Sequence, residues 1–341
     1  MTGIREKSNA GRNAALRSML LALIFVIAPL LGLSFPAEAQ QTKKISHIGF
    51  LATNNLKNNL GALRQGLREL GYVEGKNFTI EYRSADGKFD QLPALAAELV
   101  RLKVDVIVTQ GTPAAVAAQN ATKTIPIIIS GGTDPVATGL VPSLARPGGN
   151  ITGVTIMNEE LVGKRLELLK ETSPKVSSLG VLWNSANPSG VVQFKQTQSA
   201  AQELGLPLQS LDVQTVSDLQ GAFDAVTKSG VNGLVLLATV PITTHLKLVA
   251  DLAVKNRLPS IYDRSDFVEA GGLMSYGPNL SDMPHRAANY VDKVLKGANP
   301  GDLPIERPKK FEFVINLKAA KQISLTIPQS VLYRADKVIR Q

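Results

Sequence analysis

Apolar, β-branched runs alternate with amphipathic stretches along most of the chain. The runs predict strands, and stretches with apolar residues three and four positions apart predict helices. In the first half we expect strands at 45–51, 78–83, 104–109, 125–130 and 151–156, and helices at 60–70, 91–102 and 113–120. One strand and one helix in roughly 25–35 residues is typical of a doubly wound parallel sheet.

The same alternation starts again after residue 160. It predicts helices at 161–171, 191–204, 219–228 and 244–256, with strands at 179–183, 208–213, 234–238, 260–262 and 273–276. Two doubly wound α/β lobes, joined near Gly148, Gly149 and Asn150, fit this pattern better than one large sheet. Gly148 and Gly149 either act as a hinge or merely form a tight turn. We expect a late helix at 283–296, a strand at 311–315 and a terminal helix at 328–340 to complete the lobes.

The predicted limits follow from this division. The first lobe takes 43–156 plus about 281–310, and the second takes 157–280 plus about 311–341. The roughly 300 residues after the leader exceed the roughly 250 at which one core usually stops growing, so two domains are expected.

The first forty residues have the parts of a secretory signal peptide. Basic residues precede an apolar run of about 15 residues, and Ala37-Glu38-Ala39 supplies the small-x-small cleavage pattern. The run contains Pro29 and is shorter than the roughly 20 residues that span a bilayer, although a retained anchor is the alternative. We predict a signal peptide at 1–39, cleavage before Gln40, and no stable membrane insertion afterwards.

The chain of 341 residues contains no cysteine and carries a formal net charge of +9. The lack of cysteine excludes disulfides, thiolate metal sites and a lipid-modified residue at the cleavage site. A soluble, untethered exported protein suits a periplasm. The basic residues are spread out rather than clustered, so we expect no nucleic-acid partner.

Candidate ligand-binding residues follow the predicted strands, because ligands of open parallel sheets bind outside the carboxyl ends of their strands. Three strand ends lead through a polar residue and a proline into the next helix. They are Gln110-Gly111-Thr112-Pro113, Asn184-Ser185-Ala186-Asn187-Pro188 and Thr239-Val240-Pro241. With Thr112 and Asn187 as helix caps, the free N–H groups of each first turn favour an anion, although such turns are also ordinary α/β structure.

Other strand ends add to the predicted site. Thr53 and Asn54 follow the first strand, and Thr133 and Asp134 follow Gly131-Gly132 after the fourth. Asp134 either meets a ligand ammonium or hydroxyl group or caps the next turn. In the second lobe Asp263 completes the set, and three aromatic residues near strand ends either stack on a ligand or pack in the core: Trp183, Tyr262 and Tyr276.

Known catalytic and metal-binding patterns are missing from the sequence. There is no G-x-S-x-G, G-x-x-x-x-G-K or H-E-x-x-H motif, and His47, His245 and His285 match no metal-ligand spacing. We therefore predict no enzyme activity, no cofactor and no metal.

Several short segments, in order, resemble one family. They are Leu70-Gly71-Tyr72 with Gly75-Lys76-Asn77, Thr112-Pro113-Ala114-Ala115, Thr133-Asp134-Pro135-Val136, Pro147-Gly148-Gly149-Asn150-Ile151-Thr152-Gly153, Asn187-Pro188 and Phe267-Val268-Glu269-Ala270-Gly271-Gly272-Leu273. The chain is similar to ABC-transporter substrate-binding proteins of the type 1 periplasmic fold, which include tryptophan- and phenylalanine-binding proteins. The resemblance implies a small-molecule ligand in a cleft between hinged lobes, and delivery to a permease with a cytoplasmic ATPase. We expect the protein to act as a monomer.

One departure from that family bears on the ligand. Amino-acid-binding relatives carry an acidic residue after the penultimate strand of the second lobe, whereas residues 238–242 here contain none. Either Asp263 or Asp134 replaces it, or the ligand is not an α-amino acid. A periplasmic sensor that signals to a membrane partner, and an exported enzyme, are the alternative functions; neighbouring permease or histidine-kinase genes would separate transport from sensing.

Overall fold

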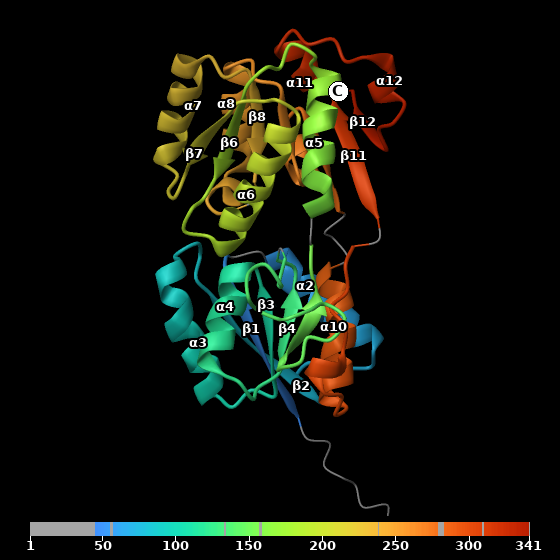
Figure 1. The fold of residues 1–341 in the computed structure, drawn as a ribbon. Coiled ribbons are helices and arrows are strands. Elements are labelled where there is room, and N and C mark those ends of the chain that lie inside the picture. Colours follow the sequence, from blue (N-terminus) through green and yellow to red (C-terminus); the bar gives the residue numbers. More distant parts are fainter. Residues whose placement is uncertain are drawn as a thin grey trace, which may run out of the picture. The chain divides into compact units, whose positions relative to one another are not determined.

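The computed structural model describes residues 45–340, apart from residues 55–56, 133, 157–158, 238, 279–282 and 309. The predicted signal peptide and Thr133 therefore lie outside the described residues. Figure 1 shows two α/β lobes, each built around its own sheet with helices between the strands. The predicted fold class is confirmed.

The first lobe contains a five-stranded parallel sheet in the order β2-β1-β3-β4-β5. Its strands are β1 (Ser46–Ala52), β2 (Phe78–Ser84), β3 (Val106–Gln110), β4 (Ile127–Ser130) and β5 (Ile151–Val154). Strands β3, β4 and β5 are buried along almost their whole length, because helices cover both faces of the sheet. The sheet is thus the core of this lobe.

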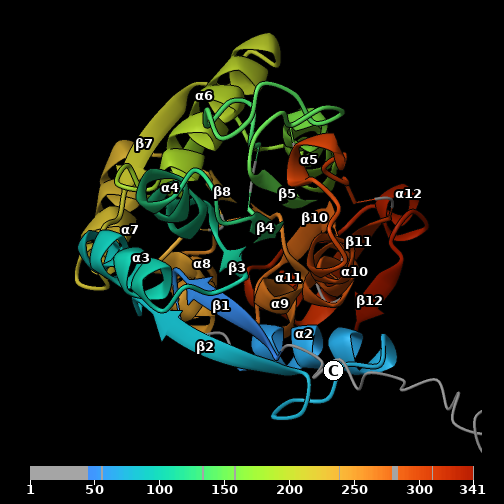
Figure 2. The same cartoon turned by 90° about the horizontal axis from the view of Figure 1, so that it is seen from below.

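Four helices cover the two faces of this sheet. Helices α2 (Lys57–Glu69) and α10 (Met283–Leu295) pack on one face, and α3 (Leu92–Arg101) and α4 (Thr112–Ala121) pack on the other (Figure 2). Helix α10 follows β5 by more than a hundred residues in sequence, so the chain returns to the first lobe late.

The second lobe has a seven-stranded sheet in the order β12-β11-β10-β9-β8-β6-β7. All its pairings are parallel except that of β10 with β11. The strands are β6 (Leu179–Trp183), β7 (Leu208–Asp212), β8 (Gly233–Leu236), β9 (Ser260–Tyr262), β10 (Met274–Pro278), β11 (Phe311–Asn316) and β12 (Lys337–Ile339).

Helices again cover both faces of this sheet. One face carries α5 (Glu159–Thr172), α6 (Pro188–Glu203), α11 (Leu317–Gln322) and α12 (Gln329–Leu332). The other carries α7 (Asp218–Ser229), α8 (Leu246–Lys255) and α9 (Ser265–Glu269). The residue limits predicted for the two lobes stay a prediction.

The predicted hinge near Gly148, Gly149 and Asn150 is wrong. Asn150 leads directly into β5, which pairs with β4, and the Gly148 N–H donates to the Gly301 carbonyl at 3.1 Å. These residues therefore stay inside the first lobe. The order of elements takes the chain between the lobes elsewhere: between β5 and α5, between β10 and α10, and before β11.

The predicted terminal helix at 328–340 is also wrong. The helix α12 ends at Leu332, and β12 then pairs in parallel with β11, with Val338 opposite Ile315. The free edge of β11 offers unpaired N–H and C=O groups, and pairing with them outweighs the weak helical pattern of the last residues.

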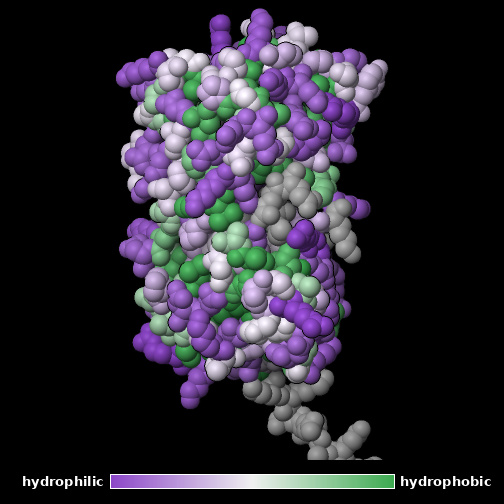
Figure 3. Space-filling view, in the orientation of Figure 1, coloured by the Kyte–Doolittle hydropathy of each residue, from purple (hydrophilic) through white to green (hydrophobic). Residues whose placement is uncertain are grey.

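The surface differs along the molecule. In the view of Figure 3, hydrophilic residues dominate both ends, and hydrophobic residues show most clearly near the level where the lobes meet. No helix in the described part of the chain is long and apolar enough to cross a bilayer.

Candidate functional site: a cavity between the lobes

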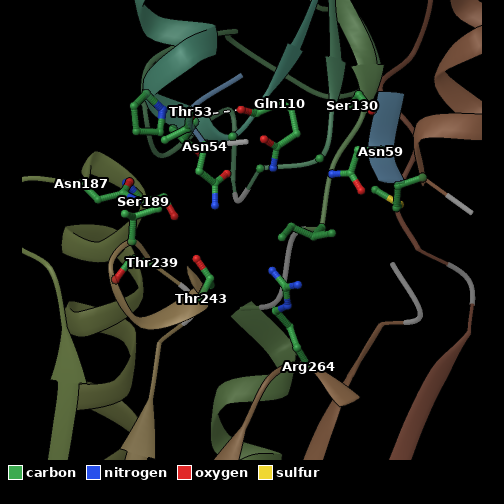
Figure 4. A pocket seen from close by; sticks show the side chains of 18 of the residues that line it. Thr53, Asn54, Asn59, Gln110, Ser130, Asn187, Ser189, Thr239, Thr243 and Arg264 are labelled. Carbon is green, nitrogen blue, oxygen red and sulfur yellow. Dashed lines mark hydrogen bonds between the residues drawn. The ribbon is translucent and has the colours of Figure 1, made fainter. Parts of the chain in front are cut away.

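A cavity of about 630 Å³ is lined by residues of both lobes (Figure 4). Its volume lies within the range of small-molecule sites. The lining residues are Thr53, Asn54, Asn59, Gln110, Gly111, Thr112, Pro113, Ser130, Gly131, Gly132, Ile156, Asn187, Ser189, Gln193, Thr239, Val240, Thr243, Asp263, Arg264, Asp266, Met283 and Pro284.

The cavity lies at the carboxyl ends of strands where the strand order of each sheet reverses. In the first sheet, β1 has β2 on one side and β3 on the other, and Thr53 and Gln110 stand at the ends of β1 and β3. The Thr53 hydroxyl donates to the Gln110 carbonyl at 3.0 Å and ties these ends together. In the second sheet, β6 lies between β7 and β8, and Asn187 and Thr239 follow β6 and β8. Ligands of doubly wound sheets bind at such reversals.

The start of α4 differs from the prediction. Thr112 is not the cap but the first helical residue, and Gly111 occupies the cap position with φ 92° and no capping side chain. A side chain at Gly111 would lie 2.5 Å from the Thr53 hydroxyl, so only glycine fits. Thr112 is buried and lines the cavity, which brings the positive end of the α4 dipole to the cavity wall.

The start of α6 follows the prediction. The Asn187 side chain accepts a hydrogen bond from the Ser189 N–H at 3.0 Å and caps the helix, with Pro188 in the first turn. One turn further, the Gln193 amide donates to the Ser189 hydroxyl at 3.0 Å, and both side chains line the cavity. Sequence reasoning missed Ser189 and Gln193, although helical periodicity places residues near the cap on one face.

The third predicted helix start takes another form. After Thr239, a 3-10 turn at Ile242–Thr244 precedes α8, so no α-helix begins at Pro241. Asn184 does not line the cavity: its amide donates to the Val240 carbonyl, and its oxygen accepts from the Ala186 N–H at 2.8 Å. Asn184 therefore holds together the two loops that carry Asn187 and Thr239.

Several oxygen atoms on the cavity wall are buried and have no hydrogen-bond partner. They are Gln110 Oε1, Ser130 Oγ, Gln193 Oε1, Thr239 Oγ1 and Asp263 Oδ1. Buried polar atoms are normally paired, and an unpaired one costs about 1–3 kcal/mol. Residues of both lobes that line the cavity thus carry buried oxygens without a partner, which the hydrogen-bond donors of a polar ligand would satisfy.

In the part of the chain that the structure describes, the charged residues that line the cavity come from one segment after β9. Asp263 is only 2% exposed, and burial raises the pKa of its carboxyl group, against the opposing charges of Arg165 and Arg264. Arg264 forms an ion pair with Asp266, with Nε 3.1 Å from Oδ1, and its guanidinium points towards the first lobe in Figure 4. The described lining residues of the first lobe are all uncharged.

Asp134 and the three aromatic candidates lie away from the cavity lining. The Asp134 carboxylate accepts from the Val136 N–H at 2.8 Å, which is the turn-capping role left open by the sequence. Among the described residues, none with an aromatic ring lines the cavity. Tyr262 stacks on Phe267, Trp183 stacks on Phe194, and Tyr276 packs beside Phe311 and Phe313.

Other lining residues were missed by sequence reasoning. Asn59 lies in the first turn of α2, the helix after β1, and Ser130 ends β4. Arg264 and Asp266 follow the predicted Asp263 directly. The strand-end rule pointed to each of these loops, but the side chains that face inward depend on the backbone path of each loop.

In the described part of the chain, no three His, Asp or Glu side chains come together in a way that could hold a metal ion. The cavity wall instead offers hydroxyl, amide and carboxylate groups beside a helix N-terminus. Fold and cavity together are typical of a two-lobed protein that binds a small molecule.

The comparison with known families agrees with this class. The family described as "ABC transporter substrate binding protein" matches residues 44–339, and the chain belongs to it. A tyrosine-binding protein of Clostridioides difficile (strain R20291) is 29% identical over 265 residues, covering 76% of this chain and 75% of the relative.

Solved structures resemble the chain over most of its length. A conserved domain protein of Vibrio cholerae is 30% identical with a TM-score of 0.82, covering 86% of this chain and 100% of that one. An ABC domain of Streptococcus pneumoniae in complex with L-Trp is 29% identical with a TM-score of 0.80, covering 86% and 99%. The leucine-binding protein LivK of Thermotoga maritima, 12% identical with a TM-score of 0.58, shares the fold.

Proposed function

We propose that the protein binds a small zwitterion, an α-amino acid or a close analogue, and delivers it to an ABC permease with a cytoplasmic ATPase. The observation that carries the proposal is the division of charge on the cavity wall. Among the described residues, the charged lining residues all belong to residues 263–266 of the second lobe, whereas the first lobe contributes uncharged groups and the start of α4.

Asp263 is the proposed partner of the ligand's ammonium group. Asp263 lines the cavity, and its Oδ1 is buried without a hydrogen-bond partner. A charge-assisted hydrogen bond from an ammonium group would satisfy this oxygen and compensate for its burial. Residues 238–242 carry no acid and Asp134 caps a turn, so Asp263 is the residue suited to this role.

The first lobe is the proposed partner of the ligand's carboxylate. Ser130 Oγ is buried and unpaired at the end of β4, and α4 begins beside it with Thr112 on the wall. A hydroxyl donor next to a helix N-terminus favours a carboxylate through both hydrogen bonding and the helix dipole. Apolar Ile156, Met283 and Pro284 would then contact the ligand's side chain.

The relatives support an amino-acid ligand. One is named a tyrosine-binding protein, and another was solved with L-Trp. A thermal-shift panel tests the proposal: the twenty amino acids, the amide and the decarboxylated amine of each, sugars and simple carboxylates. We expect intact amino acids to raise the melting temperature more than either analogue. Stabilisation by a sugar or by a carboxylate without an amine, with no response to amino acids, would refute it.

Export and transport complete the proposal. The leader pattern at 1–39 supports a periplasmic protein released by cleavage before Gln40. N-terminal sequencing of the protein from a periplasmic fraction should begin at Gln40; a membrane-bound protein that begins at Met1 would contradict cleavage. Cells lacking the gene should lose uptake of the bound ligand, and unchanged uptake with a lost transcriptional response would favour sensing instead.

A further inference from the structure

Arg165 is the largest fully buried side chain among the described residues, although arginine is rarely buried. It lies on α5 with 1% of its surface exposed. Its Nη1 donates to the Tyr276 carbonyl over a long 3.4 Å, and its Nη2 is buried without a partner. A buried guanidinium with so few hydrogen bonds is costly and needs an opposite charge nearby.

Asp263 stands next to the carbonyl that Arg165 binds. Strand β10 runs beside β9, with Ser275 opposite Tyr262. At Gly277 a side chain would lie 1.8 Å from the Asp263 carbonyl, so the β10 backbone is in direct contact with Asp263. Helix α5 packs against both strands and carries Arg165, which is not among the residues that line the cavity.

The charges around Asp263 show which cation acts on it. Arg165, Arg264 and Asp266 are the charged groups that affect its carboxylate, and Tyr276 also faces Arg165. Burial raises the pKa of Asp263, and Arg165 is the strongest of the charges that lower it. Arg264 forms an ion pair with Asp266, so the charge of Asp266 offsets part of the effect of Arg264 on Asp263. Arg165 has no such ion pair among the described residues.

We propose that Arg165 is a positioning residue that keeps the buried Asp263 carboxylate ionised from behind the cavity wall, so that the empty cavity presents a negative pole to a ligand's ammonium group. The inference rests on the proposed function for the identity of that ligand. Arg165 itself is not among the residues that line the cavity. It sets the ligand class through Asp263: a neutral, protonated Asp263 would present a donor and would no longer favour a cation.

The electrostatic role can be measured on the ligand-free protein. Aspartate labelled with ¹³C at Cγ gives one NMR titration curve per residue, and Asp263→Asn assigns the signal. In Arg165→Met, which keeps the length but removes the charge, we expect the pKa of Asp263 to rise above that of the wild type. In Arg165→Lys, which keeps the charge, it should stay closer to the wild-type value. The same midpoint in wild type and Arg165→Met would overturn the proposal.

Two further measurements separate the possible failures. If Arg165→Met does not fold, the Arg165→Met/Asp263→Asn double variant should fold, because it removes both buried charges; failure of the double variant would overturn the pairing. In the thermal-shift panel, Arg165→Met should lower the preference for amino acids over the simple carboxylates, which lack an amine, at neutral pH, and Arg165→Lys should restore it. If the wild type responds to no amino acid but the Asp263 midpoint moves in Arg165→Met, the proposed ligand is refuted and the role of Arg165 stands.

Discussion

The two lobes have the same kind of strand-end site but present different electrostatics to the cavity. The first lobe offers Ser130, Thr112 and the start of α4, without a charged residue among its described lining positions. The second lines the cavity with Asp263, Arg264 and Asp266, and the charge of the buried Arg165 acts on Asp263. A ligand with two opposite poles can satisfy both walls at once, whereas a ligand with one pole satisfies only one. The difference teaches that lobes of the same architecture can divide the recognition of one small molecule.

The helix starts of the two lobes show the same contrast at smaller scale. Both α4 and α6 follow a strand and begin with a proline in the first turn. Asn187 caps α6 with its side chain, whereas Gly111 at the cap of α4 has none to offer. The N-terminus of α4 in the first lobe therefore has no capping side chain, whereas the N-terminus of α6 in the second lobe is capped by Asn187.

Neutralising the second-lobe pole should have the largest effect. We expect Asp263→Asn to weaken amino-acid binding by roughly 30- to 5,000-fold, because losing one member of a buried charge pair costs about 2–5 kcal/mol. Calorimetry with the best amino acid from the panel measures this loss. Asp134→Asn is the matched control, since Asp134 is also buried but does not line the cavity. Equal affinities for Asp263→Asn and wild type would show that Asp263 does not bind the ligand's ammonium group.

Removing a donor from the first-lobe wall should have a smaller effect. We expect Ser130→Ala to weaken binding by about 10- to 150-fold, since a hydrogen bond to a charged group contributes about 1.5–3 kcal/mol. Ser275→Ala is the control: Ser275 Oγ is equally buried and unpaired, but Ser275 does not line the cavity. If both variants bind as the wild type does, the carboxylate is not held at Ser130.

The two helix starts should differ in stability. Asn187→Ala removes a capping side chain and should lower the free energy of unfolding by about 1 kcal/mol. Thr112→Val should cost no cap, because Gly111 holds that position, and should act on ligand affinity instead. Chemical denaturation of the ligand-free variants measures both. A larger stability loss in Thr112→Val than in Asn187→Ala would contradict the contrast.

The smallest expected signal is the pH dependence that Asp263 gives to stability. Burial holds its folded pKa above the ordinary value of 3.8, so the folded state binds this proton more tightly than the unfolded state. The stability from that proton is present below the unfolded pKa and is lost as pH rises through the folded pKa. The side chain introduced by Asp263→Asn cannot titrate. The free energy of unfolding of this variant, relative to that of the wild type, should therefore increase as pH rises above about 4. A constant difference between the two would show that Asp263 is not shifted upward.

The sequence predicted much of this architecture, because periodicity reports which faces are buried. Strands β6 and β9 have the predicted limits, and eight of the predicted site residues line the cavity: Thr53, Asn54, Gln110, Gly111, Thr112, Asn187, Thr239 and Asp263. Periodicity does not report pairing between distant segments, so it predicts a helix over the residues that form β12. It also could not show that Arg165, in a helix with no motif, is buried close enough for its charge to act on Asp263.

A crystal structure of the protein with its co-purified ligand, first identified by native mass spectrometry, tests the central claim most directly. The account predicts an amine nitrogen within hydrogen-bond distance of Asp263 Oδ1, and a carboxylate at Ser130 Oγ and the start of α4. A ligand without an amine, or one bound with its carboxylate against Asp263, would contradict it.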